Sequence, residues 1–303
     1  MRTRTSSAVR RRAARVVAAV AVAGMAIALG VPGGTSVGDA ASPFVDGGPV
    51  TDRTPVALAR AADVRARLGL PSPATSRVER VVDRFDGSAY DEVTESDATG
   101  RALGLHRFDA RGRLVGSVAF GWQAAGGPRL PNAAAARARG SRLATDLGLD
   151  AAGTPDVQPA PDDTGWTLTW SRNVDGVPVP GDGVRVDLWP DGRMHAIVRT
   201  ERPLAARPTT TFDEATARAR GTAMLGTLFG ARTDQVAITT LALAWVAPNS
   251  AFDPTGPDAP GTTLRLAWVV EARTSGPLAD ELRAVKLFVD AGTGALIGGD
   301  VLR

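Results

Sequence analysis

Two stretches of the chain carry small and apolar side chains at the spacing of an amphipathic helix. In each stretch the face advances by four, three and four residues, and its second position is a glycine. The faces consist of Ala136, Gly140, Leu143 and Leu147 in the first stretch and of Ala217, Gly221, Met224 and Leu228 in the second. The pattern predicts two helices that pack closely on a neighbouring element at their glycines.

The two predicted helices belong to an internal repeat. The five residues from Ala136 to Gly140 recur in the same order from Ala217 to Gly221. A period of about 80 residues is too long for a heptad and is typical of a repeated supersecondary unit.

Residues that start and stop helices flank both stretches. Asn132 is expected to cap the first helix, and Gly148 is expected to end it. Thr211 and Glu214 have the spacing of a capping box for the second helix, which Gly230 is expected to end.

Alternating apolar residues after each helix predict antiparallel strands. After the first helix, Trp166, Leu168 and Trp170 share one face, and further strands are expected over 177–188 and 196–198. After the second helix, the predicted strands are 264–270 and 285–289, followed by a short last strand. Tight turns with glycine are expected at 190–192 and 290–294.

A third, more divergent copy is predicted at the start of the globular part. A helix opens at Thr54 and Pro55, carries Leu58, Ala61, Val64 and Leu68 on one face, and ends at Gly69. Strands are expected near 77–86, 101–109 and 113–121. The predicted fold class is therefore α+β, built from repeated α-β-β-β units, each a helix packed on a small antiparallel sheet.

The predicted organisation is a leader followed by three units. The boundaries are 1–40 for the leader, 41–125 for the divergent unit, 126–205 for the second unit and 206–303 for the third. The third unit carries an insertion rich in Pro, Asp and Gly over 247–261, which we expect to be a surface loop.

The N-terminus has the pattern of a secretory signal peptide. Six arginines lie within the first 15 residues, and an apolar run without charge follows over 16–31. Small residues Gly38 and Ala40 lie three and one before a cut between Ala40 and Ala41. A signal anchor that stays uncut is the alternative, and the choice between general and twin-arginine export is open. The apolar run is shorter than a bilayer span, which favours a signal peptide over a membrane helix. After cleavage no stable membrane insertion is expected, because the run is removed with the leader.

Charge and composition exclude several classes of protein. The chain has 35 Lys and Arg against 32 Asp and Glu, and the leader removes six basic residues and one acidic residue. The mature chain then has 29 basic and 31 acidic residues, so we expect no nucleic-acid partner. With no Cys and only two His, the chain cannot form disulfides or a Cys-ligated metal site.

Two groups of strand residues carry a resemblance to a known family. The first is Asn173 to Val186 with the turn Asp191-Gly192-Arg193, and the second is Leu266 to Val270 with Leu287 to Gly294. These segments resemble PepSY-type domains, which also occur in the propeptides of thermolysin-like and fungalysin-like secreted metalloproteases. The resemblance covers roughly residues 132–303. It implies a propeptide-like binding module without the catalytic domain.

The candidate motifs for catalysis and metal binding are either incomplete or lie in the wrong part of the chain. His106 and His195 are followed by Arg107-Phe108 and by Ala196-Ile197, so neither begins the His-Glu-x-x-His zinc motif. Residues 34–38 fit the Gly-x-Ser-x-Gly pattern but lie within the leader. Acidic loop residues lack the spacing of an EF-hand and are read as solvated; they are Asp162, Asp163, Asp253 and Asp258. We therefore expect no catalytic residue, no metal site and no cofactor.

One tryptophan is a candidate for contact with a partner. Trp166, Trp170 and Trp268 follow the two-residue period of strands and are expected in the core. Trp189 is out of phase with the apolar positions that end at Leu188, so we expect it to face solvent or a partner.

Three functional hypotheses follow from these patterns. The favoured one is a secreted, non-catalytic binding module that inhibits or chaperones an extracellular peptidase. Its expected partner is a protein, such as a secreted metallopeptidase. The alternative is a cell-envelope structural or ligand-sensing protein, also without enzymatic activity. The third is a secreted hydrolase with a site that the sequence does not reveal. Association through a sheet face or edge is the expected binding mode.

Overall fold

The structure is a computed structural model that describes residues 53–82, 88–120, 127–161, 164–252 and 262–302. The predicted leader, with its cut between Ala40 and Ala41, lies outside the described residues. So do the acidic loop residues at 162, 163, 253 and 258. Among the described residues, no helix is long and apolar enough to cross a membrane.

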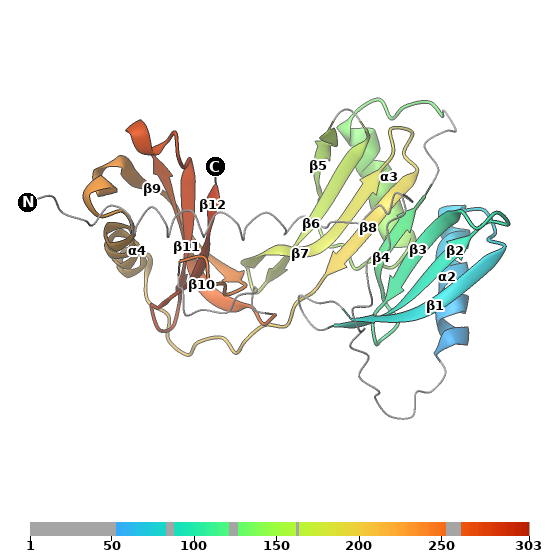
Figure 1. The fold of residues 1–303 in the computed structure, drawn as a ribbon, viewed down its shortest axis with the longest axis horizontal. Coiled ribbons are helices and arrows are strands. Elements are labelled where there is room, and N and C mark those ends of the chain that lie inside the picture. The colour runs from blue at the N-terminus through green and yellow to red at the C-terminus, as the bar shows by residue number, and fades with distance from the viewer. Residues whose placement is uncertain (1–52, 83–87, 121–126, 162–163, 253–261, 303) are drawn as a thin grey trace, which may run out of the picture.

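The fold is α+β, with two antiparallel sheets and few helices (Figure 1). The helices in the described ranges are α2 (Thr54–Leu68), α3 (Ala133–Asp146) and α4 (Glu214–Phe229), with the 3-10 turns η3 (Gly230–Gln235) and η4 (Gly276–Leu278). The first sheet has the strand order β1-β2-β3-β4-β8-β7-β6-β5, and the second has the order β12-β11-β10-β9.

The strands of the first sheet are β1 (Thr75–Val82), β2 (Ala89–Ser96), β3 (Ala102–Phe108), β4 (Leu114–Ala119), β5 (Asp156–Pro159), β6 (Trp166–Val174), β7 (Val177–Leu188) and β8 (Met194–Thr200). Those of the second sheet are β9 (Val236–Val246), β10 (Arg265–Thr274), β11 (Ala284–Asp290) and β12 (Leu296–Leu302). The meander predicted after α3 is present as β6, β7 and β8, which pair in sequence order.

The expectation of one small sheet for each unit is wrong for the first two units. Strands β4 and β8 pair antiparallel through Gly116 with Val198, Ser117 with Ile197 and Val118 with Ala196. The pairing merges the two predicted sheets into one sheet of eight strands, because each unit alone leaves an edge strand with unpaired backbone groups.

Strand β2 was missing from the sequence prediction, as were β5 and β9. The inward positions of β2 include Asp91 and Glu95, which are buried, on either side of the apolar Val93. Buried carboxylates break the apolar alternation by which strands are recognised, so the segment does not look like a strand in the sequence. Each of the two carboxylates is paired with arginine, which makes its burial possible.

The helix ends agree with the sequence prediction at all but one position. The Asn132 side chain accepts a hydrogen bond from the Ala135 N–H at 3.0 Å and so caps α3. The N-cap of α4 is Asp213, whose carboxylate accepts from the Thr216 N–H at 2.8 Å. The capping box at Thr211 and Glu214 is therefore wrong, since a cap two residues later takes its place.

The glycines of the two helical faces are points of close packing, as predicted. A Cβ added at Gly140 of α3 would lie 2.5 Å from a methyl group of Leu168 in β6. A Cβ at Gly221 of α4 would lie 2.9 Å from a methyl group of Val270 in β10. Helices α2 and α3 lie on the same face of the eight-stranded sheet, and α4 lies on the second sheet (Figure 1).

The β6–β7 hairpin connects the two sheets. Its turn uses Asp175 and Gly176, both with positive φ, which is the conformation that two-residue hairpin turns require. Beyond the first sheet, Val177 and Val179 of β7 are buried in one cluster with residues of the second sheet. These partners are Trp245, Leu264, Leu266 and Ala291. The hairpin tip therefore packs in the core of the second sheet, whereas the rest of β6 and β7 packs in the core of the first.

Candidate functional site

Trp189, the residue predicted to face a partner, is half-buried next to the β7–β8 turn. Its ring centroid lies 4.1 Å from that of His195, with the planes tilted by 32°. The indole N–H is buried without a hydrogen-bond partner among the described residues. Burial lowers the pKa of His195, and Asp187 opposes the shift while Arg185 adds to it. A role of Trp189 in partner binding stays a prediction.

Four polar residues form a chain inside the first sheet, beneath α2. The Ser117 hydroxyl lies 3.0 Å from Nδ1 of His106, and Nε2 of His106 lies 3.5 Å from a carboxylate oxygen of Glu95. Glu95 is also paired with Arg65 of α2. The chain therefore runs from β4 through β3 and β2 to the helix, in the order of the paired strands.

This arrangement has the residue types of a serine hydrolase triad, but it is sealed. The exposed fractions are 1% for Ser117, 0% for His106 and 2% for Glu95. Nε2 of His106 has no hydrogen-bond partner in the described part of the chain. In this conformation no substrate reaches the hydroxyl, so the chain of residues acts as a buried polar link between strands and helix.

Local sequence patterns do not reveal this cluster. His106 does not begin a zinc motif and is expected to be a structural or surface residue, and Glu95 lies in the strand that the sequence pattern does not predict. Only the register of β2, β3 and β4 brings the three side chains together, and register depends on contacts between distant residues. The signal that could have suggested the cluster is a single polar residue at an inward position of each of the three strands.

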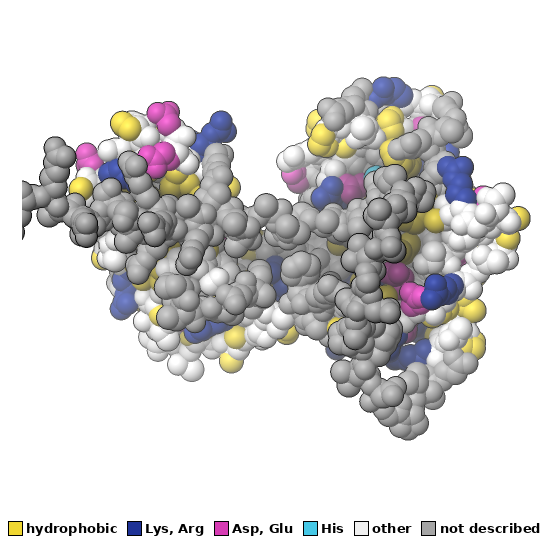
Figure 2. Space-filling view, in the orientation of Figure 1, with side chains coloured by type: hydrophobic (Ala, Val, Ile, Leu, Met, Phe, Trp, Pro, Cys, Tyr) yellow, Lys and Arg dark blue, Asp and Glu magenta, His cyan; other side chains and the backbone are white. Residues whose placement is uncertain are grey.

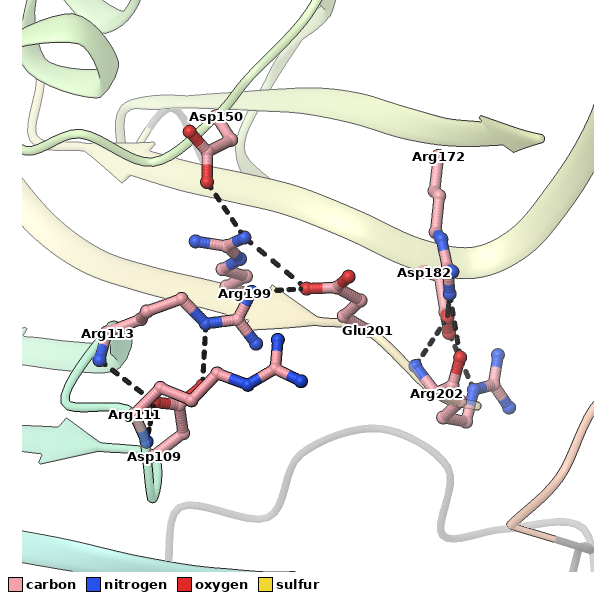
Figure 3. A network of polar contacts seen from close by, with 9 residues as sticks. All are labelled: Asp109, Arg111, Arg113, Asp150, Arg172, Asp182, Arg199, Glu201 and Arg202. Atoms are coloured by element: carbon pink, nitrogen blue, oxygen red, sulfur yellow. Dashed lines mark hydrogen bonds and ion pairs between the residues drawn. The ribbon is translucent and has the colours of Figure 1, made fainter. Parts of the chain in front are cut away.

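A second buried carboxylate fixes the point where β7 leaves the first sheet. Asp182 has a fully buried side chain and pairs with Arg172 at 3.1 Å and with Arg202 at 2.6 Å. It also accepts a hydrogen bond from the Arg202 backbone N–H at 2.8 Å. Arg172 in turn donates to the Arg202 carbonyl at 2.7 Å. Figure 3 shows the carboxylate between the two guanidinium groups.

The residue before Arg202 joins a second group of ion pairs (Figure 3). Glu201 pairs with Arg199 at 3.3 Å and with Arg113 at 2.9 Å. Arg113 also binds Asp109 at 2.7 Å in the β3–β4 turn. Burial alone would raise the pKa of Asp109, but hydrogen bonds from the backbone N–H and guanidinium of Arg113 hold it below its ordinary value.

The two groups together hold the chain where it passes from β8 toward α4. Glu201 is bound by the side chains of Arg113 and Arg199, and Arg202 is bound by those of Arg172 and Asp182. Each charged side chain named in these two groups has an oppositely charged partner, so the network offers no unpaired charge to a ligand.

Acidic and basic side chains are also mixed over the molecular surface. On the face shown in Figure 2, the Lys and Arg side chains of the described residues are interspersed with Asp and Glu side chains. Exposed pairs of this kind are Arg67 with Asp63, Arg218 with Glu214 and Arg232 with Glu281. Among the residues that the structure describes, no group of three His, Cys, Asp or Glu side chains is placed to hold a metal ion.

Three of the four sheet edges are protected against pairing with another chain. Strand β1 is mostly exposed and carries Arg77, Glu79 and Arg80. Strand β5 has four residues and ends at Pro159. The edge of β12 is occupied by Asn249, whose side chain accepts from the Gly299 N–H at 3.0 Å and donates to its carbonyl at 3.1 Å. Charge, shortness, proline and coverage are the devices by which proteins block sheet edges.

Strand β9 is the fourth edge, and its device of this kind is a β-bulge at Thr239, between the pairs of Thr240 with Glu271 and of Ile238 with Ala272. Its eleven residues, from Val236 to Val246, include no charged residue, no proline and no glycine. It pairs with β10 on one side, and no backbone hydrogen bond from its other side reaches another described residue. The structure therefore leaves one long uncharged edge unpaired.

Comparisons with known proteins give little further information. No protein-family model matches the chain, and no curated protein matches it. Among solved structures, the chain is similar to the C-terminal domain of YpeB from Bacillus megaterium, with 12% sequence identity and a TM-score of 0.45. The similarity covers 82% of this chain and 97% of that domain. A similarity of this size supports no conclusion about function.

Proposed function

We propose that this chain is a secreted, non-catalytic binding module that holds or inhibits an extracellular peptidase in trans. The observation that carries the proposal is the contrast between two features. The Ser117, His106 and Glu95 cluster is sealed from solvent, whereas β9 presents an uncharged, unpaired strand edge. Such an arrangement supports association with another chain rather than chemistry on a small substrate.

The PepSY-type resemblance is part of this proposal. Its first motif, Asn173 to Val186, forms the end of β6 and most of β7, so the residues that carry it build the hairpin between the two sheets. The proposal includes the repeated unit, in which a helix is followed by an antiparallel meander, as α3 is by β5–β8 and α4 by β9–β12. It also includes export by the leader and cleavage after Ala40.

A capture experiment tests the proposed function. The mature chain, residues 41–303, is immobilised and exposed to the culture supernatant of the source organism, and retained proteins are identified by mass spectrometry. A secreted metallopeptidase should be enriched over beads that carry an unrelated protein. Retention of cell-wall polymer without any peptidase would instead favour the cell-envelope alternative.

A further inference from the structure

Each of the three described helices places an arginine on a glycine of a hairpin turn further along the chain. The pairs are Arg60 with Gly112, Arg139 with Gly192 and Arg220 with Gly294. These shared contacts show which positions of the three helices correspond to one another. The residues that stand five positions after the three arginines are Arg65 in α2, Ala144 in α3 and Leu225 in α4.

The strands under the helices can be matched from the same turns. The turns open with residues whose N–H groups donate across the turn, namely Asp109, Trp189 and Asp290. The residues three positions before them are His106, Val186 and Leu287. The residues five positions before them pair, on the neighbouring strand, with Glu95, Trp170 and Ala272. Two polar residues of the first match therefore stand where both other matches have apolar residues.

The contact between α2 and its sheet is charged at these positions. Arg65 of α2 pairs with Glu95, whose side chain is 2% exposed, and His106 lies 3.5 Å from the same carboxylate. Nε2 of His106 has no hydrogen-bond partner in the described part of the chain. Sequences that break a local rule of this kind do so mostly at functional or strained sites.

Helix α2 also gains less from apolar burial than the other two helices. Its buried side chains are Ala57, Ala61 and Val64, whereas those of α3 and α4 include Leu143 and Leu225. Docking energy rises with the apolar area that is buried. For a buried ion pair, the loss of hydration offsets much of the attraction, so the pair of Arg65 and Glu95 does not replace the missing leucine.

We propose that α2 is a lid, which detaches from the first sheet while the sheet stays folded and thereby uncovers the buried cluster of Glu95, His106 and Ser117. Arg65 holds the lid closed and regains its hydration when the helix lifts. The contacts of α2 at Arg53 and Arg67 use side chains that are 40% and 49% exposed, so water replaces these contacts at little cost. The inference goes beyond the proposed binding function and does not depend on it.

Amide hydrogen exchange in the mature chain, followed by NMR under native conditions, tests the lid. Rates are compared after division by the rate expected for an unfolded chain of the same sequence. The amide protons of Ala61 and Val64 should then exchange at least a hundredfold faster than those of Leu143 and Leu225. The reason is that a local opening exposes only α2, whereas α3 and α4 open with the sheets.

Three variants locate the cause in the charged contact. Arg65→Met leaves the Glu95 carboxylate without its cation and should speed exchange in α2 at least tenfold, with α4 unchanged within twofold. Arg65→Leu combined with Glu95→Ala and His106→Leu introduces the residues found at the corresponding positions under α4, and should slow exchange in α2 at least tenfold. Arg218→Met is the matched control, because it removes an exposed arginine of α4 and should leave exchange in α2 within twofold of wild type.

Two outcomes would overturn the lid. The first is equal protection of the three helices in the wild type, which would mean that α2 opens only when the whole protein unfolds. The second is an equal change in α2 and α4 in Arg65→Met. Circular dichroism shows whether the triple variant folds, and the two methionine variants decide the question without it. Because no partner protein is present, both outcomes leave the proposed binding function standing.

Discussion

Asp182 binds Arg202 at two points, accepting from its backbone N–H at 2.8 Å and from its Nε at 2.6 Å. The same carboxylate pairs with Arg172. Since Arg202 begins the segment that leads from β8 to α4, one buried carboxylate ties the β7 strand to the connection between the sheets. The stability of this junction should therefore depend on that charge.

Asp182→Asn should destabilise the protein by about 2–3 kcal/mol, because it removes the buried charge and leaves two guanidinium groups with neutral partners. The loss of stability should be smaller than for a fully buried pair, because both arginines keep about a quarter of their side chains exposed. Urea unfolding measures the change. Asp175→Asn is the control, because Asp175 is exposed and pairs loosely with Arg207, and it should change stability by less than about 0.5 kcal/mol.

Substitution of two glycines of α4 by alanine should change the stability of the protein in opposite directions. Gly221→Ala brings a Cβ to 2.9 Å from Val270 and should destabilise by about 1–3 kcal/mol through overpacking. Gly226→Ala meets nothing within 4 Å and should stabilise by about 0.5–1 kcal/mol, because alanine loses less backbone entropy in a helix. Thermal unfolding of both variants checks the sign. A stabilised Gly221→Ala would show that α4 does not pack on β10 as described.

The buried pair of Arg65 and Glu95 should contribute more to the free energy of unfolding than an exposed pair does. Arg65→Met leaves the Glu95 carboxylate in the interior without its cation and should cost about 3 kcal/mol. Arg218→Met removes an exposed partner of Glu214 and should cost less than about 0.5 kcal/mol. Equal effects in chemical denaturation would contradict the burial of this cluster.

Two acids should make contributions of opposite sign to the pH dependence of stability. Burial alone would raise the pKa of Asp290, but hydrogen bonds from Thr293 and the ion pair with Arg265 hold it below its ordinary value. Its contribution is therefore present above pH about 4 and is lost as the pH falls below that value. Burial raises the pKa of Asp300, against the opposing charge of Lys286, so its contribution is present at low pH and lost as the pH rises.

Asparagine variants separate the two acids. Asp290→Asn should lower the thermal midpoint at pH 7, and the difference from wild type should shrink as the pH falls below about 4. Asp300→Asn should raise the midpoint at pH 7, because it removes a charge that burial disfavours, and should have little effect at pH 3. Shifts of the same sign at pH 7 would contradict the environments described for these side chains.

The sealed triad-like cluster predicts an absence of serine hydrolase reactivity. A fluorophosphonate probe, which labels accessible activated serines, should not label the native chain, because Ser117 is buried. Labelling of the wild type that disappears in Ser117→Ala would show that the hydroxyl becomes accessible, and would restore the hydrolase hypothesis. Labelling that persists in Ser117→Ala would place a reactive group elsewhere.

The sequence predicted those parts of the fold that depend on local patterns. The helices around Gly140 and Gly221, their packing at these glycines and the meander after α3 all follow from periodicity and turn residues. The sequence did not predict β2, because its inward Asp91 and Glu95 are satisfied by arginines from other elements. Local patterns hold no information on such long-range pairing.

The candidate sites were less accessible to sequence analysis. The Asp182 junction joins residues that are 10 and 20 positions apart, and the triad-like cluster depends on strand register. The merged sheet arises from pairing of Ser117 with Ile197, which no periodicity reveals. The uncharged run from Val236 to Val246 is visible in the sequence, but its place at an edge is not.

The most direct test of the central claim is inhibition of the captured peptidase. The purified mature chain is titrated into the peptidase that it retains, and the rate of cleavage of a fluorogenic peptide is followed. The account predicts that the rate falls with added chain to a plateau at one chain per enzyme, without cleavage of the chain itself. An unchanged rate at a large excess of chain, or retention of no peptidase at all, would contradict it.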